Sequence, residues 1–375
     1  MVFNPNSVQP QQLELTIKKS MTVDDFLLKF SRVPSNEKLF FVQNLGIMLK
    51  AGVSILTALQ TLAKQAENKK FALIITETAQ AVEKGKTLTD SLKLNQKIFG
   101  ELFINMIEAG EISGKLESVL AQLYLQMKKH HELVSKIKGA MTYPAVIMFA
   151  MVGIGIFMML IIVPQLTGML KEAGASLPLP TKILIAVSDF LTKNTLLCLI
   201  ISVVTIFTFI KTIQTKSGKY YFDLFLIKLP IFGKIIKKVN LAKFSRTISS
   251  LLKTDIMIIK TFQITATVLG NIHYRNAVEE IAEKIKKGTP INEVIATYPK
   301  LFPPIVIQMI AIGEQTGELD NILVELAEFY EDEIDEVMTN LPSIIEPVLI
   351  LVLGCGVGAM AVAILMPMYT MTSAI

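Results

Sequence analysis

The chain has 375 residues, of which 51% are hydrophobic and 18% are charged, and its formal net charge at pH 7 is +5. This composition is typical of a membrane protein that also carries sizeable soluble modules. The basic residues are dispersed and are not interleaved with aromatic residues, which argues against a nucleic-acid-binding surface. The two cysteines, Cys198 and Cys355, lie in apolar stretches and indicate packing residues rather than a disulfide framework.

The N-terminal segment, residues 1–37, is expected to be partly disordered. It lacks the apolar core of a secretory signal, so we expect membrane insertion to use the first apolar stretch itself. Thr22–Asp25 has the pattern of a capping box that opens a short helix with Phe26 and Phe30 on one side. That apolar side is either a strut packed on the first module or a docking segment for a partner.

A large part of the chain occurs twice. Phe99–Leu120 reappears as Phe302–Leu323, 203 residues later and without a gap. The same offset pairs Pro144 with Pro347, so each copy consists of a polar module and an apolar stretch that follows it. A period of this length is too long for a solenoid and indicates two homologous domains.

Both modules show helical rather than strand periodicity. Apolar residues recur at helical spacing from Phe41 onward, and the pattern is interrupted at Ala51-Gly52, where a glycine can end one helix. Similar breaks further along predict four to six short helices in each module. We therefore predict an all-α membrane protein, with a helical-bundle domain at residues 38–143 and its repeat at residues 211–343.

A glycine-flanked turn element stands in both modules. Its members are Gly110, Glu111 and Gly114 in the first copy and Gly313, Glu314 and Gly317 in the second. The later glycine of each copy can adopt the positive φ angle that ends a helix. A turn role is favoured over catalysis for both glutamates, because no partner acid, base or metal ligand accompanies either one.

Three apolar stretches are long enough to cross a bilayer, which requires about 20 residues of helix. They are Ala145–Val163, Asn194–Ile210 and Pro347–Pro367, with 19, 17 and 21 residues. Phe190 and Leu191 can extend the shorter middle stretch. The predicted transmembrane helices are residues 144–166, 189–210 and 344–367. Pro144 and Pro347 mark where the first and the last of them enter the membrane.

The distribution of Lys and Arg predicts the orientation of the chain. Residues 1–143 carry 18 Lys and Arg against 13 Asp and Glu, whereas residues 164–193 carry only three lysines. Because positively charged segments stay in the cytoplasm, both modules are expected inside, with a short loop at residues 167–188 and a tail at residues 368–375 outside. The middle span has no counterpart in the repeat, because the chain must cross back once before the second copy can start on the same side.

Three local patterns follow one another in a specific order. They are Met48–Ile55, the Gly-Glu-x-Ser/Thr-Gly-x-Leu turn in both copies, and Lys136–Pro144 leading into the first span. In kind and order they resemble the type II secretion F family, which includes the platform proteins of type IV pilus assembly. The resemblance covers about residues 38–370, and the second copy departs from it at Lys253–Ile256 and at Leu341-Pro342.

The resemblance implies a multi-pass platform protein of the inner membrane without enzymatic activity and without a cofactor. Such a platform couples a cytoplasmic hexameric ATPase to the extraction of pilin or pseudopilin subunits from the membrane. The partners that it implies are therefore the ATPase, these subunits, other inner-membrane assembly proteins and membrane lipid. We also expect a homo-oligomer.

The residues themselves argue against catalysis. Lys84–Thr87 looks like the end of a phosphate loop, but Gln80 stands where that loop requires a glycine. The three histidines, His130, His131 and His273, have no set of cysteines or carboxylates at metal-binding spacing. We therefore expect no catalytic residue and no metal site.

Two other functional classes remain open. A small transporter or channel would need ionisable residues along its path, and Glu346 at the edge of the last span is the sole candidate. A membrane signalling scaffold is compatible with the composition, and only the family resemblance ranks it lower. Gly354 and Gly358 form a Gly-x-x-x-Gly motif that suits packing within the chain as well as dimerisation.

The two copies differ in charge on the helix that leads to each exit span. The first copy has Lys128 and Lys129, and the second has Glu331, Asp332 and Glu333 at the same offset. These acids cover more than one face of a helix, so much of the charge must meet solvent or a partner. One interpretation is a solvated helix that anionic lipid headgroups repel. The other is a contact with a basic surface, either the lysine end of another copy or the ATPase.

Overall fold

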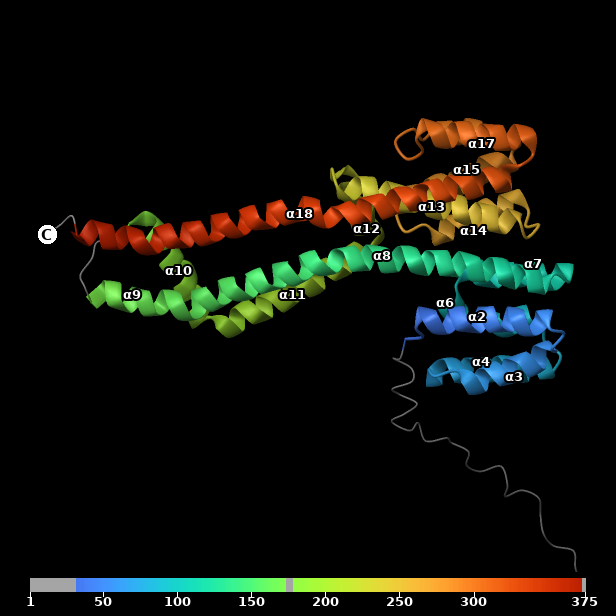
Figure 1. Ribbon diagram of the computed structural model, residues 1–375, viewed down its shortest axis with the longest axis horizontal. Helices are drawn as coiled ribbons and strands as arrows, with labels where there is room; N and C mark the ends of the chain where they lie inside the picture. Colours follow the sequence, from blue (N-terminus) through green and yellow to red (C-terminus); the bar gives the residue numbers. More distant parts are fainter. Residues whose placement is uncertain (1–31, 173–177, 373–375) are drawn as a thin grey trace, which may run out of the picture. The chain divides into compact units, whose positions relative to one another are not determined.

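A computed structural model of the chain describes residues 32–172 and 178–372. Every regular element in these two ranges is a helix, as Figure 1 shows, which confirms the all-α fold class. The helices form two compact units, Met1–Tyr124 and Leu125–Ile375. The expected capping box at Thr22–Asp25 lies outside the described residues.

The first unit is built from short helices that glycines and polar caps delimit. Its helices are α2 (Ser35–Lys50), α3 (Ile55–Gln65), α4 (Lys69–Glu83), α5 (Leu88–Lys93), α6 (Gln96–Phe99), α7 (Glu101–Ser113) and the first turns of α8 (Leu116–Phe157). Gly52 and Gly85 adopt φ angles of +80° and +85°, a region that residues with a Cβ atom rarely enter. The Ser54 hydroxyl accepts the N–H group of Thr57 and so begins α3.

The second unit contains the membrane helices and the second bundle. After the remainder of α8 its helices are η1 (Met158–Ile162), α9 (Val163–Glu172), α10 (Leu179–Lys193), α11 (Thr195–Gln214), α12 (Lys216–Lys228), α13 (Phe232–Leu252), α14 (Ile258–Val268), α15 (Ile272–Lys286), α16 (Ile291–Ala296), α17 (Pro304–Thr316) and α18 (Leu319–Thr372). Each membrane-spanning candidate is part of this series.

The helix bounds follow the sequence repeat. Helices α3, α4, α5 and α7 recur as α14, α15, α16 and α17, and each begins and ends 203 residues after its counterpart. Helices α8 and α18 also begin at equivalent positions, at Leu116 and Leu319. The four-residue helix α6 is the exception, because the corresponding residues 299–302 form a turn.

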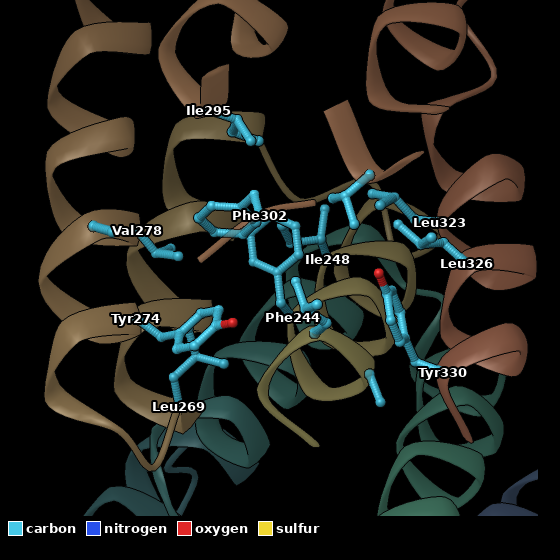
Figure 2. Close-up of a cluster of buried hydrophobic side chains, with 14 of the residues drawn as sticks. Phe244, Ile248, Leu269, Tyr274, Val278, Ile295, Phe302, Leu323, Leu326 and Tyr330 are labelled. Atoms are coloured by element: carbon cyan, nitrogen blue, oxygen red, sulfur yellow. The ribbon is translucent and has the colours of Figure 1, made fainter. Parts of the chain in front are cut away.

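An aromatic cluster occupies the core of each unit at equivalent positions. Its members are Phe41, Phe71 and Phe99 in the first unit and Phe244, Tyr274 and Phe302 in the second. The ring centroids of Phe41 and Phe99 lie 6.2 Å apart, and those of the equivalent Phe244 and Phe302 lie 5.2 Å apart. Phe71 and Phe99, at 6.1 Å, likewise correspond to Tyr274 and Phe302, at 5.7 Å. Figure 2 shows the second cluster with Ile248 and Leu326 beside it. The same aromatic contacts therefore organise both bundles.

Tyr274 is the one member of these clusters that carries a hydroxyl group. It donates a hydrogen bond of 2.7 Å to the carbonyl oxygen of Leu301, which satisfies a polar atom inside the core. Burial, together with nearby Tyr330, raises the pKa of Tyr274 above its ordinary value, so the hydroxyl remains a donor. In the first unit the equivalent residue is Phe71, which needs no such partner.

The boundary between the units differs from the expected one. We expected the first domain to extend over residues 38–143, whereas the first compact unit ends at Tyr124, inside α8. Beyond that point Leu133 and Ile137 of α8 pack into the hydrophobic core of the second unit. An apolar stripe on a long helix does not specify which of two similar cores receives it, so the sequence alone could not place this boundary.

The number of membrane helices agrees with the prediction. Within the described residues, the helices long and apolar enough to cross a membrane are found in Leu116–Met169, Thr195–Gln214 and Leu319–Met366. The segments between and after the spans differ from the expected ones. Helix α10 occupies part of the expected loop at residues 167–188. Asn194 separates α10 from α11, so Phe190 and Leu191 belong to α10 and do not extend the middle span. Helix α18 runs into the expected tail, to Thr372.

The first span contains a π-helical segment, η1, which α9 continues directly. A π turn pairs a carbonyl group with the N–H group five residues later, and for Met159 that residue is Pro164, which has no N–H. The hydroxyl of Ser188 donates to the Met159 carbonyl oxygen instead, at 2.6 Å. A buried serine on α10 therefore compensates for the proline and ties α10 to the first span.

Candidate functional site

Glu111 lies in the last turn of α7 and caps a different helix. Its carboxylate accepts the N–H groups of Leu88 at 2.7 Å and Thr89 at 2.9 Å, and the Thr89 hydroxyl at 2.6 Å. Leu88 and Thr89 are the first residues of α5, where N–H groups have no partner within the helix. The carboxylate satisfies two of these groups and places negative charge at the helix N-terminus, where it is stabilising.

Glu314 makes the equivalent contacts in the second unit. Its carboxylate accepts the N–H groups of Ile291 at 2.8 Å and Asn292 at 3.1 Å, at the start of α16. Both donors lie 203 residues after their counterparts in the first unit. The glutamate of the repeated turn is thus a cap supplied by tertiary structure, and it fixes the short helix to the helix that precedes the turn.

The glycines of the turn have two separate functions. Gly114 and Gly317 end α7 and α17 with φ angles of +68° and +75°, the left-handed conformation that the sequence predicts. Gly110 lies inside α7, where an added Cβ atom would come within 3.0 Å of Val119 on α8. A Cβ atom on Gly313 would come within 2.9 Å of the α18 backbone. These two glycines allow each long helix to fold back closely on the helix before it.

A cluster of charged side chains joins α8, α13 and α18. Arg246 of α13 is only 6% exposed, and it donates from Nε at 2.8 Å and from Nη2 at 2.9 Å to the two carboxylate oxygens of Glu331. The Nζ atom of Lys129 lies 3.2 Å from Glu331, and the Nη2 atom of Arg246 lies 3.8 Å from Glu328. A two-pronged arginine–carboxylate pair is strong and geometrically specific, so it fixes how these helices meet.

The structure therefore brings together Lys129 and Glu331, two of the five residues for which we expected a partner contact. Both belong to the same chain. A second ion pair joins the same two long helices, between Lys136 of α8 and Asp335 of α18. Because the residue numbers increase together in the two pairs, α8 and α18 run in the same direction through this region.

The other three expected contact residues are placed differently. Lys128 lies 3.9 Å from Glu132, one turn later on the same helix. Glu333 pairs with Lys238 of α13. Asp332 is exposed, and among the described residues it has no ion-pair partner within 4.0 Å. Much of the acidic run is thus neutralised within the chain, and Asp332 remains available to solvent or a partner.

Sequence reasoning missed Arg246 of this cluster and also Gln126, which joins α8 to α13. Gln126 of α8 is buried, and it donates to the Thr247 hydroxyl at 3.1 Å and accepts from the Ser250 hydroxyl at 3.1 Å. One signal was present in the sequence, because Arg246 is one of only three arginines in a chain rich in lysine. Arginine is the preferred cation for buried ion pairs.

Pro144 and Pro347, which we expected to mark membrane entry, lie inside unbroken helices. A proline in a helix leaves the carbonyl group four residues earlier without its helical partner. Membrane helices tolerate this because neighbouring groups, ordered water and local adjustment satisfy the freed backbone group. Each bundle is therefore joined to its exit span by continuous helix.

The histidines lie on different helices of the second unit. His130 and His131 are neighbours on α8. His273 is the second residue of α15, and its Nε2 atom lies 3.2 Å from the Tyr220 carbonyl oxygen. Within residues 32–172 and 178–372, no group of three His, Cys, Asp or Glu side chains is placed to hold a metal ion.

Comparison with known proteins identifies the family to which the repeat belongs. The family model described as type II secretion system (T2SS), protein F, matches residues 41–164 and again residues 244–367. The two matches are 203 residues apart, as are the equivalent helices. The chain belongs to the type II secretion F family. Members of this family are structural platform proteins of secretion systems in the inner membrane, and the family is not a known enzyme family.

Relatives from both pilus and secretion systems match over most of their length. The chain is 39% identical over 329 residues to the type IV pilus assembly protein PilC of Thermus thermophilus, covering 88% of this chain and 81% of that protein. It is 31% identical over 359 residues to PilC of Myxococcus xanthus, covering 96% and 86%. It is also 30% identical over 332 residues to the type II secretion system protein F of Vibrio cholerae, covering 88% and 81%.

Replacing Glu111 with alanine should loosen α5 locally. The substitution removes a cap whose loss typically destabilises a helix by about 1 kcal/mol, and more where a buried N–H group is left unpaired. We expect amide hydrogen exchange in Leu88–Lys93 to become about fivefold faster or more, since 1.4 kcal/mol corresponds to a factor of about ten. Mass spectrometry of the full chain in detergent measures this exchange. Glu108→Ala removes only an exposed ion pair to Lys93 and is the control, and unchanged exchange in Glu111→Ala would contradict the cap.

Replacing Glu331 with glutamine should destabilise the second unit far more than replacing Lys129 with glutamine. Glu331→Gln leaves the buried Arg246 with Glu328 alone, and breaking a buried ion pair typically costs about 3–5 kcal/mol. Lys129→Gln leaves the Arg246 pair intact and should cost at most about 1 kcal/mol. Thermal unfolding in detergent, followed by circular dichroism, measures the difference. Asp332→Asn is the matched exposed control, and equal melting temperatures for Glu331→Gln and Asp332→Asn would refute the role of the cluster.

Proposed function

We propose that this chain is a non-enzymatic inner-membrane platform that couples a cytoplasmic assembly ATPase to the assembly of type IV pilin or pseudopilin fibres. Membership of the type II secretion F family supports this role. Relatives named for type IV pilus assembly and for type II secretion both match the chain, so the proposal includes pilin and pseudopilin fibres. Other inner-membrane assembly proteins and further copies of the chain complete the proposed assembly.

The observation that carries this proposal is that the last helix of each repeat is also a membrane span. Helix α8 begins at the Gly114 turn and continues past Pro144, and α18 begins at the Gly317 turn and continues past Pro347. A force applied to either helix outside the membrane therefore acts directly on a span, without a flexible linker. Such continuity suits a protein that transmits ATP-driven movement to subunits held in the membrane.

The proposal requires both bundles to face the cytoplasm, where the ATPase resides. The positive charge of residues 1–143 supports this orientation. In that orientation, the segment between the first and the second span lies on the opposite side of the membrane.

A candidate ATPase-contact face lies on the first bundle beside the repeated turn. Ile112 is 82% exposed and Leu94 is 74% exposed, although both are large apolar residues. An exposed ion pair of 3.1 Å links Lys93, at the end of α5, to Glu108 of α7; Leu94 follows Lys93, and Ile112 stands one turn after Glu108. In the second bundle the equivalent positions carry the polar residues Thr297 and Gln315. Because these positions are apolar in the first bundle and polar in the second, we assign this face of the first bundle to partner binding.

Exchanging the two apolar residues for those of the second copy tests this assignment. The double variant Leu94→Thr with Ile112→Gln should keep the protein level and melting temperature unchanged, because the second bundle already folds with these residues. Co-purification of the secretion ATPase should fall about tenfold, as expected for loss of two apolar anchors. The matched control is Leu73→Asn, another exposed leucine replaced by its second-copy residue. ATPase recovery equal to that of the unchanged chain would contradict the proposed face.

Reporter fusions test the orientation. A fusion at Ser217, before the second bundle, should report the cytoplasm, and a fusion at Ser176, between α9 and α10, should report the opposite side. An alkaline phosphatase fusion should thus be active only at Ser176, and a green fluorescent protein fusion should fluoresce only at Ser217. Matching sidedness at the two positions would contradict the three-span topology.

A further inference from the structure

The second unit contains a cavity of about 430 Å³ between its helices, close to where α8 enters the span. Its walls include Ile137 and Met141 of α8, Ile235 and Val239 of α13, and Met338 and Leu341 of α18. Nearly all of this lining is hydrocarbon or thioether. The cavity is partly open to the surface, and its volume lies in the range of about 300–1,000 Å³ that is typical of ligand pockets.

The polar groups at the cavity wall are already used by the protein. The Asp223 carboxylate accepts the Ile272 N–H group at 2.8 Å, at the start of α15. The Asn240 amide donates to the Ile236 carbonyl oxygen at 2.7 Å, and the Asn271 side chain accepts the His273 N–H group at 2.9 Å. With these groups engaged, the cavity offers little to a polar solute and suits a hydrocarbon chain.

Met141 also lines a second, open groove on the surface of α8. This groove follows one face of the helix from Lys138 through Thr142 and Ala145 to Phe149. Ala145 is the first residue of the uncharged stretch, so the groove passes from the headgroup level into the hydrocarbon level of the membrane. Met141 therefore borders both the cavity and this groove.

Lysines outnumber acidic residues in the helical segments that line the cavity and the groove, although the Asp223 carboxylate is itself part of the cavity wall. Lys138 lies at the outer end of the groove, and Lys228, Lys234 and Lys237 alternate with lining residues along α12 and α13. Within the described residues, none of these four lysines has a carboxylate partner within 4.0 Å. Basic pockets beside membrane helices favour anionic lipid headgroups.

We propose that the cavity holds one acyl chain of an anionic phospholipid from the leaflet nearest the bundles, with the headgroup phosphate beside Lys138. The chain enters along the groove and passes Met141. This site is independent of the proposed fibre-assembly function, since the argument uses only the cavity, its charge and its place beside the span.

Photolabelling of the full chain tests the proposal. The chain is reconstituted in lipid nanodiscs with phosphatidylglycerol that carries a diazirine in one acyl chain, irradiated, digested and mapped by mass spectrometry. We expect labelled residues at 137–141 of α8 and 235–239 of α13. Val239→Phe, which fills the cavity from α13, should reduce this labelling at least fivefold. Val203→Phe, the same substitution at an exposed position of α11, should leave it unchanged.

Two further variants keep the test decisive if Val239→Phe does not fold. Leu226→Phe fills the cavity from α12, and Lys138→Gln alters only an exposed side chain. Lys138→Gln should halve the preference for phosphatidylglycerol over phosphatidylcholine carrying the same diazirine chain. Labelling confined to exposed residues of α11 and insensitive to the filling variants would overturn the site. Equal labelling by the two lipids in the unchanged chain would overturn the proposed preference for an anionic lipid. In a separate experiment a photoreactive amino acid replaces Val239, and cross-linking of this residue to another protein would overturn lipid as the occupant.

Discussion

In each repeat one helix serves both as a wall of a soluble bundle and as a membrane span, and most of the structure follows from this constraint. Such a helix needs an apolar stripe where it packs in the bundle and apolar residues on all sides where it meets lipid. Both α8 and α18 are continuous from the turn that begins each helix into the span. This explains why the repeated turn is so tightly built, with Gly110 and Gly313 admitting the long helix and Glu111 and Glu314 holding the neighbouring short helix.

The two copies keep the same framework and differ in the chemistry placed on it. The aromatic core, the turn glycines and the capping glutamates occur at equivalent positions in both units. By contrast, Glu331 stands where the first copy has Lys128, and Arg246 stands where it has Gln43. The second copy thereby gains a buried ion pair that connects its own helices to Lys129. Duplication supplied two similar scaffolds, and substitution gave only one of them this ionic junction.

The features that the sequence predicted well depend on local or repeated patterns. Helical periodicity, three long apolar stretches and the positive φ angles at Gly114 and Gly317 all follow from residues close together in the chain. The features that it could not predict depend on which segments meet in the folded protein. Glu111 showed no partner in the sequence because its partners are backbone N–H groups 22 and 23 residues earlier. Likewise, Arg246 and Glu331 are 85 residues apart, and only the packing of α13 against α18 makes them neighbours.

The junction of α8, α13 and α18 changes character along its length. At the level of Lys129, Arg246 and Glu331 the three helices are joined by charge-assisted hydrogen bonds. At Ile137, eight residues further along α8 and so about 12 Å closer to the span, the same helices enclose the apolar cavity. Ionic contacts with fixed geometry resist sliding, whereas an incompletely filled apolar space offers fewer contacts to be lost when a helix shifts. The three helices are therefore held firmly at the level of the bundle and can adjust where they approach the membrane, and an acyl chain in the cavity would make that adjustment dependent on the surrounding lipid.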